Sequence, residues 1–468
     1  MKTSILSLIL TIALLLSAFA GCSSDTETPK DIPDNTPTGT SPDAPETEPD
    51  YSWFTMPEET GKLTIYSPGN YYSSVLNPAI EIFKQLYPEI EVSYEILSNE
   101  EYETRIRTEI PAGKGPDLIL MEDTTFPDLY KTMETDLFED LNPYFGTDGE
   151  IALSEFVRPV MDTGVMNGKR YVAPLCYKVP VLMTTQSILD EIGMTAEELA
   201  TCDGFCEGAK RFHEKYPDST LFFDIGGLSP TVTDVCTLYR NFGFNIINHE
   251  TNEVEIDEGR FRQCLDLAKL YYDPDYDTDE EAVWDIPYYG AGGGLHLKLF
   301  PYDSFGGNSY SIYFTSQTFL GNDGEEPVLF LPANQHDGVT AQIVLGAAIP
   351  KGAADKSSAW KLLKILLSND IQGGHDPKRF NNSYFWVGLP VRLESTKPML
   401  TSESGTTPDG PEFDEYIRLV QSPTEAVILP QMYIKYLKEF MLPYVYGEKP
   451  WDDCYKKFLG AVELYKDE

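Results

Sequence analysis

An alternation of apolar strands and amphipathic helices limits the fold of this 468-residue chain more than any other feature. Residues 63–66 form an apolar run, and residues 75–87 carry apolar side chains at helical spacing. Residues 90–97 are rich in β-formers, 100–110 repeat the helical spacing, and 117–121 are apolar again. This β-α-β-α-β order is typical of a mostly parallel sheet with helices on its faces. The sequence therefore predicts an α/β fold.

Polar and aromatic side chains directly follow two of these strands. Asn70, Tyr71 and Tyr72 come after the first strand, and Glu122 and Asp123 come at the end of the third. In open α/β sheets, ligands bind in the crevice beyond the carboxyl ends of the strands. The first loop contains no Gly-x-Gly-x-x-Gly run, so a dinucleotide site is not indicated. We expect these five side chains to contact a ligand.

The N-terminus is typical of a secreted lipoprotein. Lys2 precedes an apolar run, Ile5–Phe19, and small residues then precede Cys22. The run is shorter than the about 20 apolar residues that a membrane span needs, which favours a signal peptide over an uncleaved anchor helix. Residues 19–22 resemble the lipobox of bacterial lipoproteins, in which the Cys is lipidated and becomes the new N-terminus. We expect residues 1–21 to be removed and Cys22 to anchor the protein to the extracytoplasmic face of the cell membrane.

The segment that follows the signal is acidic and poor in apolar side chains. Residues 22–60 consist largely of Thr, Pro, Asp, Glu and Ser, which predicts a disordered stalk behind the lipidated Cys. The whole chain carries a formal net charge of −40, spread along its length. Such a surface repels nucleic acid, so we expect no nucleic-acid partner.

The cysteines and histidines do not form a metal-binding pattern in the sequence. Cys202 and Cys206 stand four residues apart, but no second Cys or His pair accompanies them, and the five histidines are scattered. The acidic run 273–281 places Thr278 and Trp284 where an EF-hand loop needs Gly and Glu. We therefore expect a solvated loop there, with a looser calcium site as the alternative, and no bound metal or cofactor.

The second half of the chain contains further α/β elements. Residues 171–175 and 179–184 are predicted to be two strands joined by residues 176–178. The remaining predicted elements are a strand at 343–349 and helices at 260–272, 357–367, 425–445 and 451–466.

Five segments, in this order, resemble the family 1 bacterial extracellular solute-binding proteins. They are Val75–Pro88, Gly115–Met121, Asn167–Pro174, Ala347–Ala353 and Gly388–Arg392. Each motif alone is loose, and the order carries the resemblance. Residues 183–186 read Met-Thr-Thr-Gln where many members have a Tyr-Asn pair, and residues 205–340 match poorly.

The resemblance implies a periplasmic-binding-protein type II fold, with two α/β lobes around a ligand cleft joined by a hinge. By analogy, residues 61–166 plus 346–400 form the first lobe and residues 167–345 plus 401–468 form the second. Such a protein works with the permease subunits of an ABC importer, and we expect it to be a monomer. Hinge closure on a ligand would let the permease distinguish the loaded protein from the empty one.

A sugar is the expected ligand. Its apolar faces pack on aromatic rings and its hydroxyl groups bind carboxylates or amides. Besides the residues after the two strands, the aromatic candidates for contact are Tyr177, Trp284, Tyr288, Tyr289 and Trp386. The alternatives are a binder of a peptide or of another small organic solute and, less favoured, a surface glycoside hydrolase. We expect no enzyme activity, because no Gly-x-Ser-x-Gly, His-based triad or metal motif is present.

Overall fold

In the computed structural model, the described part of the chain begins at Asp50. The residues that it describes are 50–69, 72–122, 126–127, 129–217, 239–240, 242–249, 251–271, 296–300, 327–336, 338–374, 388–399, 417–418, 420–428 and 430–467. No helix among these residues is both long enough and apolar enough to cross a membrane.

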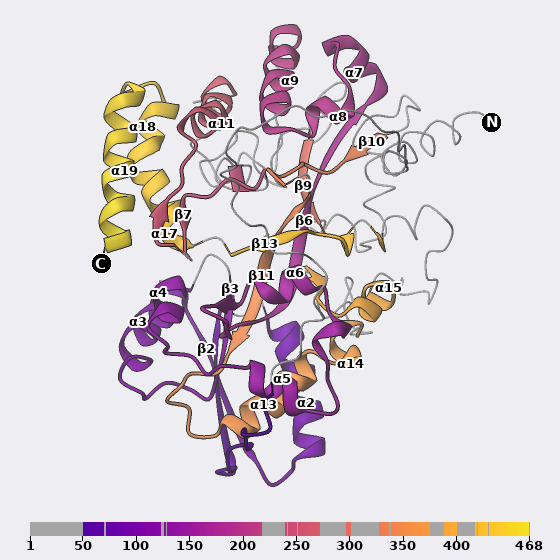
Figure 1. Cartoon of the computed structure of the whole chain (residues 1–468), viewed down its shortest axis with the longest axis vertical. Coiled ribbons are helices and arrows are strands. Elements are labelled where there is room, and N and C mark those ends of the chain that lie inside the picture. Colours follow the sequence, from indigo (N-terminus) through magenta and orange to yellow (C-terminus); the bar gives the residue numbers. More distant parts are fainter. Residues whose placement is uncertain are drawn as a thin grey trace, which may run out of the picture. The chain divides into compact units, whose positions relative to one another are not determined.

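The predicted β-α-β-α-β region is confirmed (Figure 1). Its elements are β1 (Lys62–Pro68), α2 (Ser73–Leu86), β2 (Glu91–Leu97), α3 (Asn99–Glu109) and β3 (Leu118–Glu122). β1 pairs in parallel with β2 on one side and with β3 on the other. The helices form where the apolar side chains recur at helical spacing, and α2 buries Val75, Ala79 and Phe83 in a hydrophobic cluster that also includes residues of β1 and β3.

The main sheet is mixed rather than mostly parallel. Its strand order is β10-β6-β11-β3-β1-β2, with β12 and β9 paired to β6 and β13 paired to β11. β11 is antiparallel to both β3 and β6. The bounds of these strands are β6 (Ala173–Thr185), β9 (His296–Phe300), β10 (Pro327–Phe330), β11 (Thr340–Ala348), β12 (Leu389–Pro390) and β13 (Glu425–Val427).

β6 is one long strand where the sequence predicts two. Cys176 and Tyr177 stay extended because they pair with β11 on one side and with β12 on the other. Up to Lys178 the strand pairs with β11, and from Val179 onward it pairs with β9. β6 therefore changes partners between two consecutive residues.

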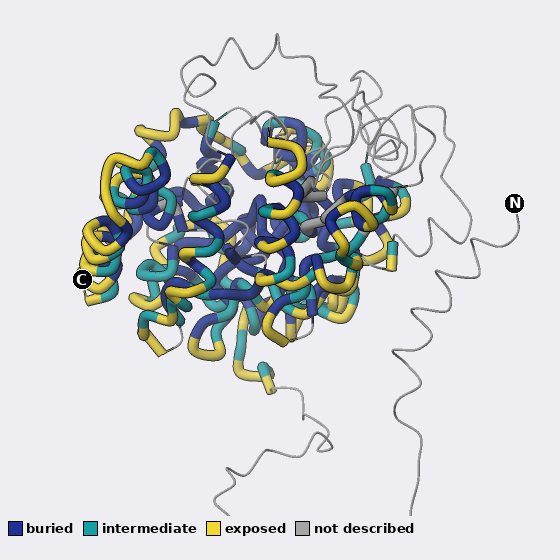
Figure 2. The backbone as a smooth tube through the Cα atoms, turned by 90° about the horizontal axis from the view of Figure 1, so that it is seen from above, coloured by how far each residue is buried: buried dark blue, intermediate teal, exposed yellow. Residues whose placement is uncertain are grey.

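Buried residues, dark blue in Figure 2, fill the interior of the described part of the chain. Their hydrophobic side chains form two clusters. The first cluster draws on β1, β3, β11 and the first half of β6, and it extends along the chain to Ile428. The second cluster begins at Ile188 and includes the last helices of the chain. Among the described residues, the chain thus passes from the first cluster to the second within 179–188, returns to the first between Tyr271 and Ala341, and enters the second again within 428–432. The predicted lobe boundaries at 166/167, 345/346 and 400/401 stay a prediction.

The shorter elements and the remaining helices complete the fold. α2 and α13 (Lys356–Leu366) pack together, as do α9 (Cys202–Lys215) and α11 (Glu258–Leu270). The other helices are α4 (Leu129–Glu134), α5 (Asn142–Thr147), α6 (Arg158–Asp162), α7 (Gln186–Ile192), α8 (Ala196–Leu199), α14 (Asn369–Gln372), α15 (Thr396–Met399), α17 (Gln431–Tyr436), α18 (Leu442–Val445) and α19 (Trp451–Asp467). Two small hairpins pair β4 (Val165–Met166) with β5 (Lys169–Arg170) and β7 (Ile247–Asn248) with β8 (Glu253–Val254).

The predicted helix at 425–445 is wrong in its first part. Residues 425–427 form β13, since they pair in parallel with the start of β11. Pro430 precedes α17, and Pro443 stands in the first turn of α18. A proline lacks the backbone N–H that a helix interior needs, so the helical segment begins after Pro430 and is not one regular helix.

Residues 50–60, which the sequence placed in the stalk, contact the folded unit. The Phe54 ring lies 4.6 Å from the ring of Tyr144, and the backbone N–H of Thr60 donates to Asp355 at 2.7 Å. Residues 1–49, with the predicted signal and Cys22, lie outside the described residues.

Candidate functional site

Two of the predicted ligand-binding residues meet at the carboxyl edge of the sheet. β1 and β3 are parallel neighbours, so the loop after β1 and the end of β3 lie at the same edge. The Tyr72 hydroxyl donates to Glu122 Oε1 at 2.8 Å. The ring of Tyr72 is buried in the first cluster, whereas Glu122 is half-buried. What Tyr72 brings to this edge is therefore its hydroxyl group rather than a flat exposed ring.

The Glu122 carboxylate also acts on a second buried tyrosine. Burial, together with the nearby charge of Glu122, raises the pKa of Tyr102, whose hydroxyl donates to the Leu120 carbonyl at 2.7 Å. Tyr102 therefore remains a neutral hydrogen-bond donor beneath this edge. The pair of Tyr72 and Glu122 offers a ligand a carboxylate already oriented by a hydroxyl group.

Tyr177 is placed differently from the pair at the sheet edge. It lies in the middle of β6 and is fully buried, and its hydroxyl donates to the Val420 carbonyl at 2.8 Å. Burial raises the pKa of this phenol. The other predicted contact residues lie outside the described residues and stay predictions: Asn70, Tyr71, Asp123, Trp284, Tyr288, Tyr289 and Trp386. The acidic run 273–281 also lies there.

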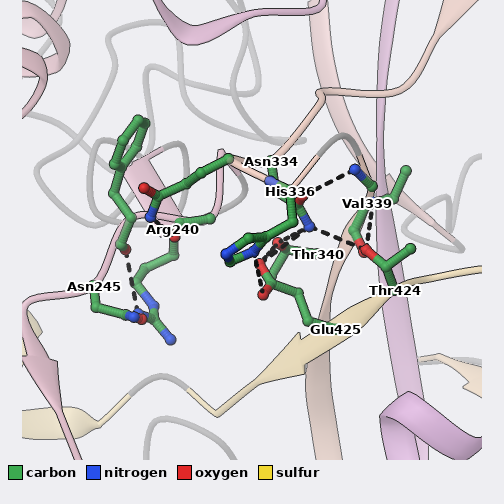
Figure 3. Close-up of polar contacts among 12 residues, drawn as sticks. Arg240, Asn245, Asn334, His336, Val339, Thr340, Thr424 and Glu425 are labelled. Atoms are coloured by element: carbon green, nitrogen blue, oxygen red, sulfur yellow. Dashed lines mark hydrogen bonds and ion pairs between the residues drawn. The ribbon is translucent and has the colours of Figure 1, made fainter. Parts of the chain in front are cut away.

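A partly buried polar network centres on the buried Asn334 and joins segments far apart in the chain (Figure 3). The Asn334 amide Nδ2 donates to Thr340 Oγ1 at 3.2 Å, to Thr424 Oγ1 at 3.2 Å and to Glu425 Oε1 at 3.1 Å. Its Oδ1 accepts from the backbone N–H groups of His336 and Gly338. The network ties the first residue of β11 to the first residue of β13. No local pattern predicts it, because Asn334 and Glu425 are 91 residues apart.

The same network reaches the segment at 239–249. Gln335 Nε2 donates to the Gly243 carbonyl at 2.6 Å, and a Cβ at Gly243 would lie 2.6 Å from Asn334 Cβ. Gly243 also has a φ of 77°, a left-handed conformation that favours glycine. The contact therefore requires glycine at this position, both for its conformation and for its lack of a side chain.

An aromatic stack connects the two hydrophobic clusters. The rings of Tyr130 and His249 are parallel, with centroids 3.6 Å apart, and His249 Nε2 lies 2.8 Å from the hydroxyl of Tyr433. Tyr130 packs against the first cluster and Tyr433 belongs to the second. Burial, and then the positive charges of Arg240 and Lys131, lower the pKa of His249 to about 3. His249 is therefore neutral at physiological pH.

A small polar pocket adjoins this stack. It is lined by Tyr130, Lys131, Glu134, Met166, Ile247, His249, Asn252, Tyr465 and Lys466. Lys131 Nζ donates to the Lys466 carbonyl at 3.2 Å, so part of its wall is already hydrogen-bonded. No local sequence pattern indicates this pocket, because its lining comes from four separate stretches of chain.

Within the described part of the chain, one group of side chains has the geometry of metal ligands. The Sγ atoms of Cys202, Cys206 and Cys264 all lie within 4.8 Å of one another. Cys202 and Cys206 stand at helical spacing in the sequence, whereas Cys264 follows Cys202 by 62 residues. A local sequence pattern does not indicate a single cysteine that another helix brings close.

The chain is similar to known proteins in part of its sequence and in its fold. The sequence model of the bacterial extracellular solute-binding protein family matches residues 66–219. Among curated proteins, none matches the sequence.

Solved structures share the fold at low sequence identity. The sugar-binding protein MalE from Xanthomonas citri has a TM-score of 0.59 at 15% identity, covering 87% of this chain and 97% of its own. The acarbose-binding GacH receptor of Streptomyces glaucescens has a TM-score of 0.55 at 13% identity, covering 88% and 100%. A solute-binding protein of Thermotoga lettingae bound to α-D-tagatose has a TM-score of 0.54 at 15% identity, covering 86% and 99%.

At these identities the solved structures establish the type II periplasmic-binding-protein fold. The match over residues 66–219 and the common fold confirm the family resemblance that the sequence indicated, to the bacterial extracellular solute-binding proteins.

Proposed function

We propose that the protein is an extracytoplasmic substrate-binding lipoprotein of an ABC importer, which captures a mono- or oligosaccharide and delivers it to a membrane permease. The observation that carries the proposal is the pairing of Tyr72 with Glu122 at the carboxyl edge of the sheet, in a chain of solute-binding fold. A half-buried carboxylate at that edge is suited to accept hydrogen bonds from sugar hydroxyl groups.

The pairing of strand β6 is consistent with a hinge between the parts of the sheet that it joins. Because it changes partners between Lys178 and Val179, a small rotation there would move β9 and β10 relative to β11 without breaking the strand. Cys22, as the lipid attachment site, would hold the binding unit near its permease and raise the rate of delivery.

A thermal-shift screen of the full-length protein tests the ligand class. The probes are monosaccharides and oligosaccharides, including tagatose and acarbose, together with short peptides and Ca²⁺. A ligand that binds only the folded state stabilises it by about 2.7 kcal/mol at 100 times its Kd. A rise in melting temperature with a sugar that is not degraded supports the proposal. A rise in melting temperature with peptides alone would indicate a peptide rather than a carbohydrate as the ligand. Hydrolysis of the sugar would contradict a binding function.

Calorimetry on a matched pair of variants then tests the site. Glu122→Gln keeps the shape of the side chain but removes its charge, and a hydrogen bond to a charged group contributes about 1.5–3 kcal/mol. We therefore expect the sugar found in the screen to bind at least about tenfold more weakly.

The matched control is Glu109→Gln. Glu109 Oε2 also accepts from a tyrosine hydroxyl, that of Tyr66, at 2.9 Å, but it stands at the C-terminal end of α3, away from the carboxyl ends of the strands. Equal sugar affinity in both variants would remove Glu122 from the site while leaving the ligand class established.

A further inference from the structure

Three buried cysteines from two helices converge in the second hydrophobic cluster. Cys202 is the first residue of α9, Cys206 lies one turn later, and Cys264 lies in the middle of α11. They are 5%, 1% and 0% exposed, respectively. The Sγ atoms of Cys202 and Cys264 are 3.9 Å apart, and all three Sγ atoms lie within 4.8 Å of one another. These residues form the three-cysteine cluster.

The packing of the two helices holds this cluster in place. Residues four apart share one face of a helix, so Cys202 and Cys206 both face α11. On one side of the cluster Arg260 Nη2 pairs with Asp203 at 3.1 Å. On the other side the Tyr271 hydroxyl donates to the Ala209 carbonyl at 2.7 Å. Contacts at both ends therefore fix the position of Cys264 opposite the other two.

The spacing of the sulfur atoms corresponds to ligands around one ion. Thiolates that bind a metal at about 2.3 Å are separated from each other by about 3.8–4.0 Å in tetrahedral or trigonal geometry. A disulfide needs an S–S distance of about 2.05 Å, and it would use two of the cysteines and leave the third thiol buried beside it. The 3.9 Å between the Sγ atoms of Cys202 and Cys264 is therefore the separation expected of two ligands of one ion, and the Sγ of Cys206 lies within 4.8 Å of both.

The chemistry of the donor atoms restricts which metal ions the cluster could bind. In the described part of the chain no His, Asp or Glu completes the cluster, so its donors are three sulfur atoms. Hard ions such as Ca²⁺ and Mg²⁺ require oxygen ligands, and structural zinc sites are almost always four-coordinate. Thiolate ligands favour soft ions, copper(I) among them. The three cysteines belong to the second hydrophobic cluster, whose apolar side chains limit the access of water to the sulfur atoms.

We propose that Cys202, Cys206 and Cys264 form a closed site for a monovalent thiophilic metal ion of the copper(I) type. Each cysteine that binds the ion releases its proton, and no electron is transferred. The bound ion would link the N-terminus of α9 to α11 and thereby stabilise the second hydrophobic cluster. The ion enters by opening of the first turn of α9, where helix ends fray. This site is independent of the proposed sugar site.

The test uses the full-length protein, fully reduced and free of metal, under anaerobic conditions. Copper(I) is supplied as its acetonitrile complex and competes with a copper(I) chelator of known affinity. We expect a single tightly bound copper ion per chain, a sulfur-to-copper charge-transfer band in the ultraviolet, and a higher thermal unfolding midpoint. Cys206→Ala and Cys264→Ala should each abolish the band and the rise in midpoint.

Cys454→Ala is the matched control, because Cys454 is a buried free cysteine of the same hydrophobic cluster but lies outside the three-cysteine cluster. The unfolding midpoint of each metal-free variant establishes that it is folded, and Cys206→Ser provides a second substitution should the alanine variant fail to fold.

Three results would each overturn the proposal. The first is that the reduced parent protein does not bind copper(I). The second is that both cluster variants bind copper as the parent does. The third is that zinc(II) binds with the same dependence on the cysteines while copper(I) does not. Thiol mapping by mass spectrometry of protein isolated without reductant provides a further test, since a Cys202–Cys264 disulfide would also contradict a metal site.

Discussion

Replacing Asp355 by Asn should destabilise the protein strongly, because this carboxylate serves two segments at once. Its Oδ1 accepts from the backbone N–H of Ser358 at 2.9 Å and so caps α13. Its Oδ2 accepts from the backbone N–H and the hydroxyl of Thr60, at 2.7 and 3.0 Å, and from the N–H of Gly61 at 3.2 Å. Asp355 is fully buried, so water does not replace these partners.

The expected loss of stability follows from the hydrogen bonds that the Asn amide group cannot accept. In either orientation the Asn Nδ2 group faces a hydrogen-bond donor, at the helix cap or at Thr60 and Gly61. A hydrogen bond to a charged group contributes about 1.5–3 kcal/mol, and a lost helix cap costs about 1 kcal/mol. Because these contributions do not add fully, we expect a loss of about 3 kcal/mol. At about 2.1 cal/mol/K per residue of unfolding entropy, this lowers the melting temperature of a unit of this size by about 3–4 °C.

Scanning calorimetry of the full-length protein measures the effect. The control is Glu81→Gln, which makes the same chemical change at an exposed position within α2. A melting temperature of Asp355→Asn within about 1 °C of that of the control would refute the assignment of this carboxylate as a double acceptor.

The same carboxylate predicts a pH dependence. Burial raises the pKa of Asp355, but hydrogen bonds from Ser358 and Thr60 outweigh it, so the pKa is lowered below the ordinary value. A lowered folded-state pKa means that the stabilisation is fully present above the unfolded value of about 3.9 and is lost as the pH falls through the folded value. The difference in melting temperature between the parent protein and Asp355→Asn should therefore be constant near neutral pH and shrink below about pH 4.

Three further substitutions test the packing, each measured by thermal unfolding. Gly164→Ala should destabilise by about 1–3 kcal/mol or prevent folding, since its Cβ would lie 2.0 Å from the Val172 carbonyl oxygen; parent-like stability would contradict this close approach. Trp360→Phe should cost about 1–3 kcal/mol, because it removes the indole N–H that donates to Asp148 at 2.8 Å, and an unchanged midpoint would rule that bond out as a contribution. Gly193→Ala should cost about 1 kcal/mol from backbone strain alone, because Gly193 ends α7 at a φ of 66° with open space around it; stabilisation would contradict that conformation.

The sequence predicted only the part of the candidate site that lies at the carboxyl ends of the strands. Tyr72 and Glu122 each follow a strand whose apolar run is visible in the sequence, and parallel neighbours bring their carboxyl ends together. The sequence did not indicate that the Tyr72 ring would be buried and only its hydroxyl presented. That depends on α2 and the sheet packing around the ring.

The sequence by itself determined the α/β alternation of the first region and the resemblance to the solute-binding family. Both depend on periodicity and on the order of motifs, which are local properties of the chain. Only the tertiary structure decided that β6 is continuous, that residues 425–427 form a strand, and that Cys264 joins Cys202 and Cys206. In each case the deciding partner lies far away in the chain: Ile343 for Tyr177 of β6, Thr340 for Glu425, and Cys264 for Cys202. Pairing over such separations follows from how the elements pack together, which a local pattern does not encode.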